Sequence, residues 1–108
     1  MIVAIREYLT EKGASPFALW FEGLDTTAAA KVATALYRLE QGNFSRVRGV
    51  GSGVYECKID FGPGYRVVYF GKDGEEIIIL LGGGSKKRQS ADISSALDCW
   101  QDYKRRKR

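Results

Sequence analysis

The sequence predicts an α+β fold, in which one small sheet packs against three helices. Three stretches place apolar residues three and four positions apart, as one face of a helix requires. Five short runs rich in Val, Ile, Tyr and Phe have the length and composition of strands. Turns of only a few residues join the last four runs, and such turns imply antiparallel neighbours. We therefore expect a small antiparallel sheet in the order β-α-α-β-β-β-β-α, with the helices packed mainly against one face.

The N-terminal half is expected to hold one strand and two helices. Residues 2–5 are apolar and begin the strand. Ser15-Pro16 is a helix start, with Ser as the N-cap and Pro at the first helical position. Asp25 or Thr26 caps the second helix, and Gly42 ends it.

The second half is expected to hold four strands and a final helix. The strands are predicted at residues 46–50, 54–61, 65–70 and 77–81. The last of these is apolar at every position, as in a central strand covered on both faces. Gly82-Gly83-Gly84-Ser85 is expected to connect it to the helix, whose apolar residues include Ile93 and Trp100.

Length and composition bound the possible functions. The chain has 108 residues, 44% hydrophobic and 28% charged, and we expect one domain over residues 1–108. The absence of His excludes a Ser-His-Asp triad and His-ligated metal sites, and no cofactor is expected. Cys57 and Cys99 match no metal pattern and are expected to be reduced thiols. Because there is neither a signal peptide nor a long apolar run, we expect a cytoplasmic protein without membrane contact.

Positive charge is concentrated near the C-terminus. The net charge is +4, from 17 basic and 13 acidic residues. The basic tail at 104–108 and the cluster Lys86-Lys87-Arg88 contain eight of the bases. An anionic partner such as nucleic acid is one interpretation. For the tail, a frayed and solvated helix end is an equally good one, because cations suit that end of the helix dipole.

Charged residues also flank the Gly-Pro-Gly turn after residue 61. A three-residue loop would pair Phe61 with Tyr65 and place Lys58 and Arg66 on one face, with Glu56 two positions along. A loop of two or four residues would turn Arg66 to the other face. We expect the three-residue loop, because the alternative buries Arg66 without a clear partner. A salt-bridged and chemically inert surface remains the competing interpretation.

The segment from Gly82 to Arg88 is a candidate anion site. It leads from a central strand into a helix start, where free backbone N–H groups favour an anion. The segment lacks the Gly-Lys-Ser/Thr pattern of nucleotide P-loops, so a phosphodiester fits better than ATP. A flexible, soluble connector is the alternative.

Two long segments resemble a known family. Residues 53–71 (GVYECKIDFGPGYRVVYFG) and 77–96 (IIILLGGGSKKRQSADISSA), with the earlier ALYRLEQGNF, are similar to the RelE/ParE superfamily of type II toxins. More closely, they resemble the phage-derived HigB-like group, often called addiction module killer proteins. The resemblance runs from the first strand to Trp100 and implies a RelE-like fold.

The resemblance also implies a function. It suggests a toxin held inactive by a co-expressed antitoxin of the helix-turn-helix type. The toxin would act as a metal-independent endoribonuclease that cuts mRNA on the ribosome. A non-enzymatic inhibitor of DNA gyrase is a second possibility, and a degenerate prophage module that only binds antitoxin is a third. Val54, Val68 and Phe70 are candidates for the antitoxin contact.

The site residues follow from the same resemblance. Those expected to serve catalysis are Arg66, Lys58, Glu56 and Lys86; those expected to bind RNA are Arg46, Arg48, Lys87 and Arg88. In such a reaction the 2′-OH attacks the adjacent phosphorus in line. Arg66 would grip the phosphate, and Glu56 or Lys58 would accept the proton. Tyr103 is expected to pack rather than to act as an acid.

Overall fold

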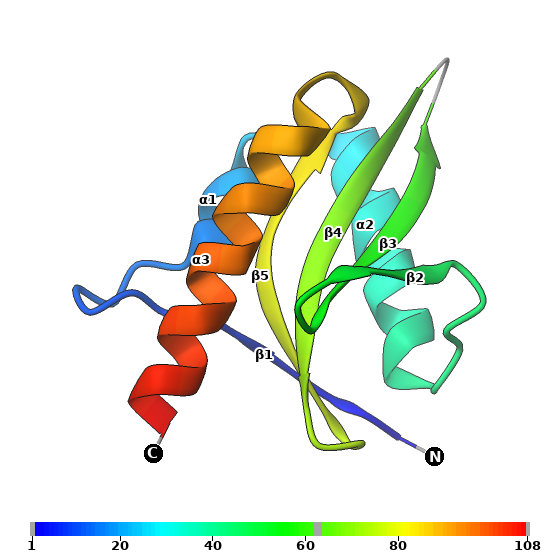
Figure 1. Cartoon of the computed structure of the whole chain (residues 1–108). Helices are drawn as coiled ribbons and strands as arrows, with labels where there is room; N and C mark the ends of the chain where they lie inside the picture. The colour runs from blue at the N-terminus through cyan, green and yellow to red at the C-terminus, as the bar shows by residue number, and fades with distance from the viewer. Residues whose placement is uncertain (1, 62–63, 108) are drawn as a thin grey trace.

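The computed structural model describes residues 2–61 and 64–107, and it confirms the predicted order of elements (Figure 1). The elements are β1 (Ala4–Glu7), α1 (Pro16–Glu22), α2 (Thr26–Glu40), β2 (Val47–Gly51), β3 (Val54–Phe61), β4 (Gly64–Asp73), β5 (Ile77–Ser85), the 3-10 turn η1 (Lys86–Arg88) and α3 (Gln89–Lys107). The fold is therefore α+β, as expected. Gly62 and Pro63, which belong to the predicted turn, lie outside the described residues.

Both predicted helix starts are confirmed by their caps. The Ser15 side chain accepts a hydrogen bond from the backbone N–H of Ala18, and Pro16 follows at the first helical position. The Asp25 carboxylate accepts one from the N–H of Ala28, which identifies Asp25 rather than Thr26 as the second cap. Each cap satisfies an N–H group that has no partner within the helix.

The sheet is mixed rather than wholly antiparallel. Its strand order is β1-β5-β4-β3-β2, and β1 runs parallel to β5 while the other pairs are antiparallel. The expectation was wrong for β1 alone. Tight turns fix the direction of the last four strands, whereas α1 and α2 separate β1 from β2 and leave its direction free.

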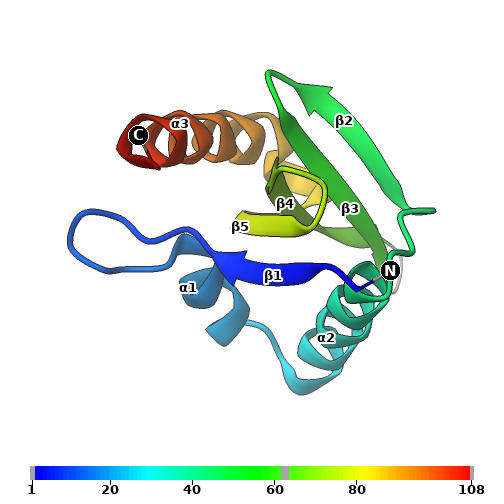
Figure 2. The same cartoon turned by 90° about the horizontal axis from the view of Figure 1, so that it is seen from below.

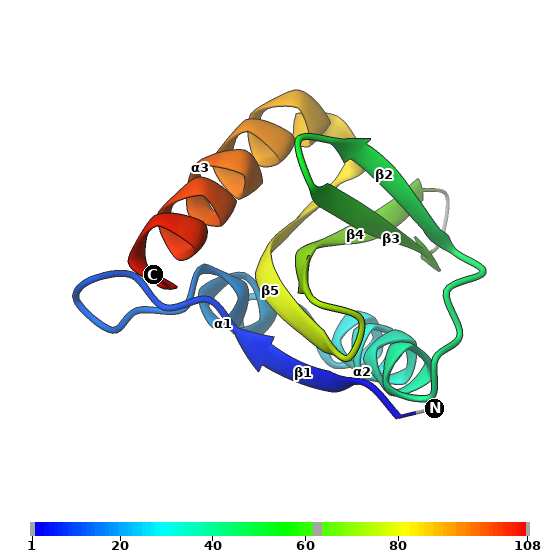
Figure 3. The same ribbon diagram turned by 60° about the horizontal axis from the view of Figure 1, so that its bottom comes forward.

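Helices cover both faces of the sheet, which corrects the expectation of one covered face. In Figures 2 and 3, α3 lies on one side of the sheet and α1 and α2 lie on the other. Each side has its own hydrophobic core. Both faces need cover because successive residues of a strand point to opposite faces. In β4, the four successive residues Val67 to Phe70 are all 1% exposed or less. Val54, Val68 and Phe70 are buried in these cores, so the partner contact expected of them is wrong.

The register of the β3–β4 hairpin differs from the expected one. Phe61 pairs with Gly64, so only two residues separate the strands, and Arg66 consequently pairs with Ile59. Paired residues lie on the same face of a sheet, which places Arg66 on the α2 side. Glu56 and Lys58 lie on the α3 side, where they pair with Tyr69 and Val67. The expected common face for Arg66 and Lys58 is therefore wrong.

The glycines after residue 81 belong to β5 and do not form the predicted connector loop. Gly83 and Gly84 pair with Val68 and Val67 of β4. A Cβ on Gly83 would lie 2.2 Å from the ring of Trp20, and one on Gly84 would lie 2.0 Å from the Asp92 carboxylate. These two glycines make room for side chains from both helical layers.

Gly71 likewise makes room for a side chain, in this case one of α3. A Cβ on this residue of β4 would lie 2.5 Å from the ring of Trp100, which is itself 5% exposed. We expect Gly71→Ala to lower the free energy of unfolding by about 1–3 kcal/mol, because overpacking forces the ring or the strand to move. Gly49→Ala in β2 is the control, since its Cβ would meet Tyr55 at an ordinary 3.9 Å. Urea unfolding measures both, and equal stabilities would contradict this account of the packing of α3.

Candidate functional site

Glu56 is the one buried charged residue in the described part of the chain, with 2% exposure. Its carboxylate accepts a hydrogen bond from Arg48 of β2, at 3.2 Å between Nη2 and Oε2. The amide of Gln89, at the start of α3, donates to its other oxygen across 3.5 Å. A buried carboxylate is costly unless it is paired in this way. Because the Arg48 side chain is 70% exposed, the ion pair connects the interior with the surface.

Lys58 and Tyr65 extend this group toward the end of the hairpin. The Tyr65 hydroxyl donates to the side-chain oxygen of Gln89 at 2.9 Å. The Lys58 ammonium lies 4.6 Å from the centre of the Tyr65 ring, within the range of a cation–π interaction. We call these five side chains, Arg48, Glu56, Lys58, Tyr65 and Gln89, the polar cluster. They come from β2, β3, β4 and α3.

Two members of the polar cluster were not assigned a role from sequence. In the sequence, Gln89 is part of the segment 77–96 that resembles the toxin family, and Tyr65 is the first residue of a predicted strand. Neither residue type signals a site by itself. Their shared hydrogen bond joins positions 24 apart in the chain, and pairing of that kind depends on where α3 begins relative to β4.

Three exposed cations of η1 precede Gln89 directly in the chain: Lys86, Lys87 and Arg88. The turn η1 lies against β4, at the same end of the sheet as the end of β3 and the start of β4 (Figure 1). The predicted basic residues at 86–88 are thus next to the polar cluster, and α3 begins there with its positive dipole end.

The remaining predicted residues are placed elsewhere. Arg66 lies on the opposite face of β4 and pairs with Ser85 of β5, so the two strands bring it to the same end of the sheet as η1. Arg46 forms an ion pair of 3.0 Å with Asp60, and both side chains are exposed. The structure thus unites Arg48, Glu56 and Lys58, but it does not bring Arg66 to their face.

Tyr69 is a further buried polar residue next to this site. It pairs with Glu56 across β3 and β4, and it is 1% exposed. Its hydroxyl has no hydrogen-bond partner among the described residues. Burial, and then the negative charges of Asp92 and Glu56, raise the pKa of Tyr69 to about 12. The phenol therefore stays neutral beside the buried carboxylate.

Metal ligands do not gather in residues 2–61 and 64–107, where no three Cys, Asp or Glu side chains come together. Cys57 is buried and Cys99 is half-buried, and burial raises the pKa of both thiols. The site chemistry available to the polar cluster is therefore that of one carboxylate, two cations, an amide and a phenol.

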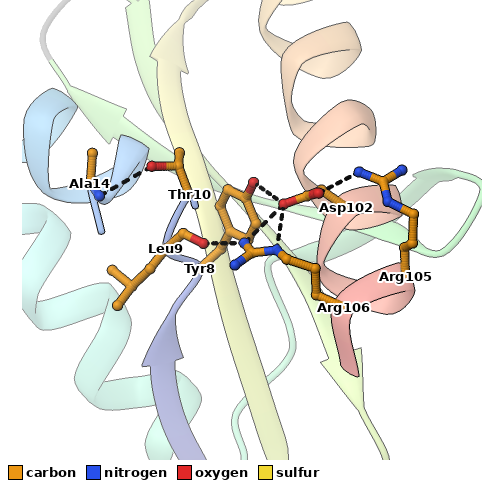
Figure 4. Close-up of polar contacts among 7 residues, drawn as sticks. All are labelled: Tyr8, Leu9, Thr10, Ala14, Asp102, Arg105 and Arg106. Atoms are coloured by element: carbon orange, nitrogen blue, oxygen red, sulfur yellow. Dashed lines mark hydrogen bonds and ion pairs between the residues drawn. The ribbon is translucent and has the colours of Figure 1, made fainter. Parts of the chain in front are cut away.

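The basic tail is folded onto the domain. The helix α3 continues to Lys107, and Figure 4 shows Asp102 accepting hydrogen bonds from Tyr8, Arg105 and Arg106. The Tyr8 hydroxyl lies 2.6 Å from the carboxylate, and Arg106 also donates to the Leu9 carbonyl. This favours the interpretation of the tail as a helix end, although ion pairs hold that end in place and it is not frayed.

Asp73 provides a second attachment. It accepts a hydrogen bond of 2.6 Å from Tyr103 and forms an ion pair with Lys107. Tyr103 also stacks on Trp100, which confirms its expected packing role. Of the described tail cations, Lys104 lies over the Trp100 ring at 5.7 Å, and the other three pair with these two carboxylates.

These attachments predict how stability depends on pH. The hydrogen bond from Tyr8 lowers the pKa of Asp102 below its ordinary 3.8, and the contact with Lys107 does the same for Asp73. Each carboxylate therefore stabilises the fold above its ordinary pKa, and this contribution is lost as the pH falls through the lowered value. We expect the melting temperature to fall below pH 4 and this fall to be smaller in Asp102→Asn, as measured by thermal unfolding.

At alkaline pH, Tyr103 makes the stability of the fold decrease as the pH rises. Burial, and then the hydrogen bond to Asp73, raise the pKa of Tyr103 from 10.0 to about 12. The folded state therefore favours the neutral phenol, so the stabilisation is complete below pH 10 and is lost as the pH rises toward 12.

The acid prediction has a clear contrary outcome. An Asp102→Asn variant whose melting temperature falls below pH 4 as much as that of the parent would contradict the role assigned to the Asp102 carboxylate.

Comparisons with known proteins found a family model and a relative that each cover most of the chain. The family model described as "Phage derived protein Gp49-like (DUF891)" matches residues 19–98, which include the polar cluster and η1. The chain is also 37% identical over 97 residues to an uncharacterized protein of Haemophilus influenzae, covering 89% of this chain and 91% of that protein. Within the described residues, none of the helices has the length and apolar character needed to span a membrane. The chain belongs to the Gp49-like family of phage-derived proteins, a toxin-like module related to the RelE-type toxins.

Proposed function

We propose that this protein is the toxin of a type II toxin–antitoxin system and that it cleaves mRNA on the ribosome without a metal ion. Membership in the Gp49-like family supports the toxin class. The observation that carries the nuclease proposal is the polar cluster, in which a buried carboxylate lies beside Arg48 and Lys58. The cations of η1 add positive charge at the same end of the sheet.

The proposed chemistry is an in-line attack of a ribose 2′-OH on the adjacent phosphorus. The exposed guanidinium of Arg48 is suited to bind two phosphate oxygens, and Lys58 supplies a second positive charge. When Arg48 turns toward the phosphate, one oxygen of Glu56 is released to accept the proton of the 2′-OH. The cations of η1 would stabilise the charge that develops on the phosphate and on the departing 5′-oxygen.

Gln89 and Tyr65 act as positioning residues in this proposal. The Gln89 amide holds the second oxygen of Glu56, and the Tyr65 hydroxyl holds the amide in turn. Glu56 can thus keep one fixed hydrogen bond while its ion pair with Arg48 opens. Arg66 would reach the RNA only where the strand passes the end of the sheet, beside Ser85 and η1.

The site is tested by substitutions that keep the fold. We expect Glu56→Gln to lower the rate of mRNA cleavage by about 100- to 1000-fold, because the amide retains the shape but cannot accept the proton. Lys58→Ala should have an effect of similar order, and Arg66→Ala a smaller one. The measurement is primer extension on mRNA in a translating extract, with Lys104→Ala as a matched control for loss of one exposed cation.

The controls distinguish a variant that fails to fold from one that folds but cannot cleave mRNA. Thermal unfolding should give cooperative transitions for all four variants. Codon-phased cleavage by Glu56→Gln or Lys58→Ala at the parental rate would contradict the site. Full loss in Arg66→Ala with little loss in Lys58→Ala would place the chemistry on the other face of the sheet.

A second candidate function is a non-enzymatic toxin that blocks DNA gyrase. Two observations favour it: Arg66 lies away from the polar cluster, and the Glu56 carboxylate is already occupied by two donors. A binding protein needs no free base, so such a saturated cluster would serve only to hold α3 in place.

Supercoiling assays distinguish the two functions. On the nuclease proposal, the purified protein leaves the supercoiling activity of gyrase unchanged, while mRNA in the extract acquires new 5′ ends. Intact mRNA together with inhibited supercoiling would contradict the nuclease proposal and support the gyrase inhibitor.

A further inference from the structure

A groove of about 720 Å³ lies between α2 and β3, on the face of the sheet opposite α3. Small side chains of α2, including Thr27, Ala30 and Thr34, form one wall. Buried or half-buried apolar residues, among them Leu39 and Ile59, contribute to the lining. This volume is within the range of pockets that bind ligands or peptide side chains.

Cations lie around the apolar residues that line the groove. Lys31 and Arg38 of α2 and Arg46 before β2 line the groove, while Asp60 is the one carboxylate among the described residues that line it. Asp60 is paired with Arg46. Lys31 and Arg38, both exposed, therefore leave the groove positively charged, and their charges favour an acidic occupant.

The lining favours a polypeptide over RNA. None of the described residues that line the groove is aromatic. Single-stranded nucleic acid is usually held by aromatic rings on which the bases stack, together with cations. An apolar floor with a charged rim is instead the arrangement of a protein–protein contact. The small residues of α2 allow a partner segment to approach the helix closely.

We propose that this groove binds an acidic segment of the antitoxin, one that also carries apolar side chains. The identity of the partner rests on the proposed toxin–antitoxin function, whereas the chemistry of the segment rests on the groove alone. The groove includes Lys58 in its lining, and Lys58 is also a member of the polar cluster. The Lys58 ammonium lies over the Tyr65 ring on the α3 face, so the groove and the polar cluster are separate surfaces on opposite faces of β3.

The test uses the full chain and the protein encoded by the neighbouring reading frame. Ala30→Trp fills the groove, and Lys31→Glu reverses a charge on its rim. The matched controls are Ala33→Trp, an exposed position of α2 outside the groove lining, and Lys12→Glu, an exposed position in the loop after β1. Isothermal titration measures the affinity, hydrogen exchange locates the contact, and primer extension measures the mRNA cleavage of each free variant.

We expect Ala30→Trp and Lys31→Glu each to weaken binding by about tenfold or more, and the controls to bind as the parent does. Slower hydrogen exchange on binding should be centred on α2 and β3. All four free variants should cleave mRNA at the parental rate, since none of these residues belongs to the polar cluster.

Three results overturn the inference: equal binding by the Ala30→Trp and Ala33→Trp variants, protection confined to the α3 face, or no binding by the neighbouring protein. Crosslinks from ribosomal or messenger RNA to α2 in place of protein protection would assign the groove to RNA. A protein that binds its partner through the groove yet leaves mRNA intact would retain this inference while the proposed nuclease function fails.

Discussion

The packing of α3 across the sheet determines most of what this molecule can do. The helix covers the face of β3 and β4 that carries Glu56, and its first residue supplies the Gln89 amide that holds this carboxylate. Trp100 seats the middle of the helix over Gly71, and Asp73 and Asp102 attach its end to β4 and to Tyr8. A carboxylate buried to 2% exposure is tolerated only because α3 and Arg48 both donate to it.

This packing assigns different tasks to the positive charges. Arg105, Arg106 and Lys107 are engaged with carboxylates and hold the helix in place. Lys58, as a member of the polar cluster, and the neighbouring cations of η1 lie at the opposite end of α3. Lys31 and Arg38 belong to a third region, the groove on the other face of the sheet. The net charge of +4 therefore does not describe one binding surface.

Much of the fold was predictable because it rests on local signals. The caps at Ser15 and Asp25, the periodicity of the helices and the alternation of β3 all depend on neighbours in the chain. The glycines at 82–84 were misassigned because the need for Gly83 and Gly84 comes from distant residues, since Trp20 and Asp92 occupy the space where their side chains would lie. The direction of β1 and the cover on both faces likewise depend on contacts between elements far apart in sequence.

The candidate site was predictable as a set of residues but not as an arrangement. A hairpin with one residue fewer in its loop moved Arg66 to the far face, and sequence alone does not decide that register. The same step left Glu56 and Lys58 beside Tyr65 and Gln89, whose contribution depends on where α3 begins. In the proposed function, RNA meets the protein at this polar cluster. Photo-crosslinking of ribosome-bound protein to an mRNA with a 2′-deoxy group at the cleavage position tests it directly. Crosslinks to Lys58, Tyr65 and η1 are predicted; crosslinks confined to α2 or to the face of Arg66 would contradict it.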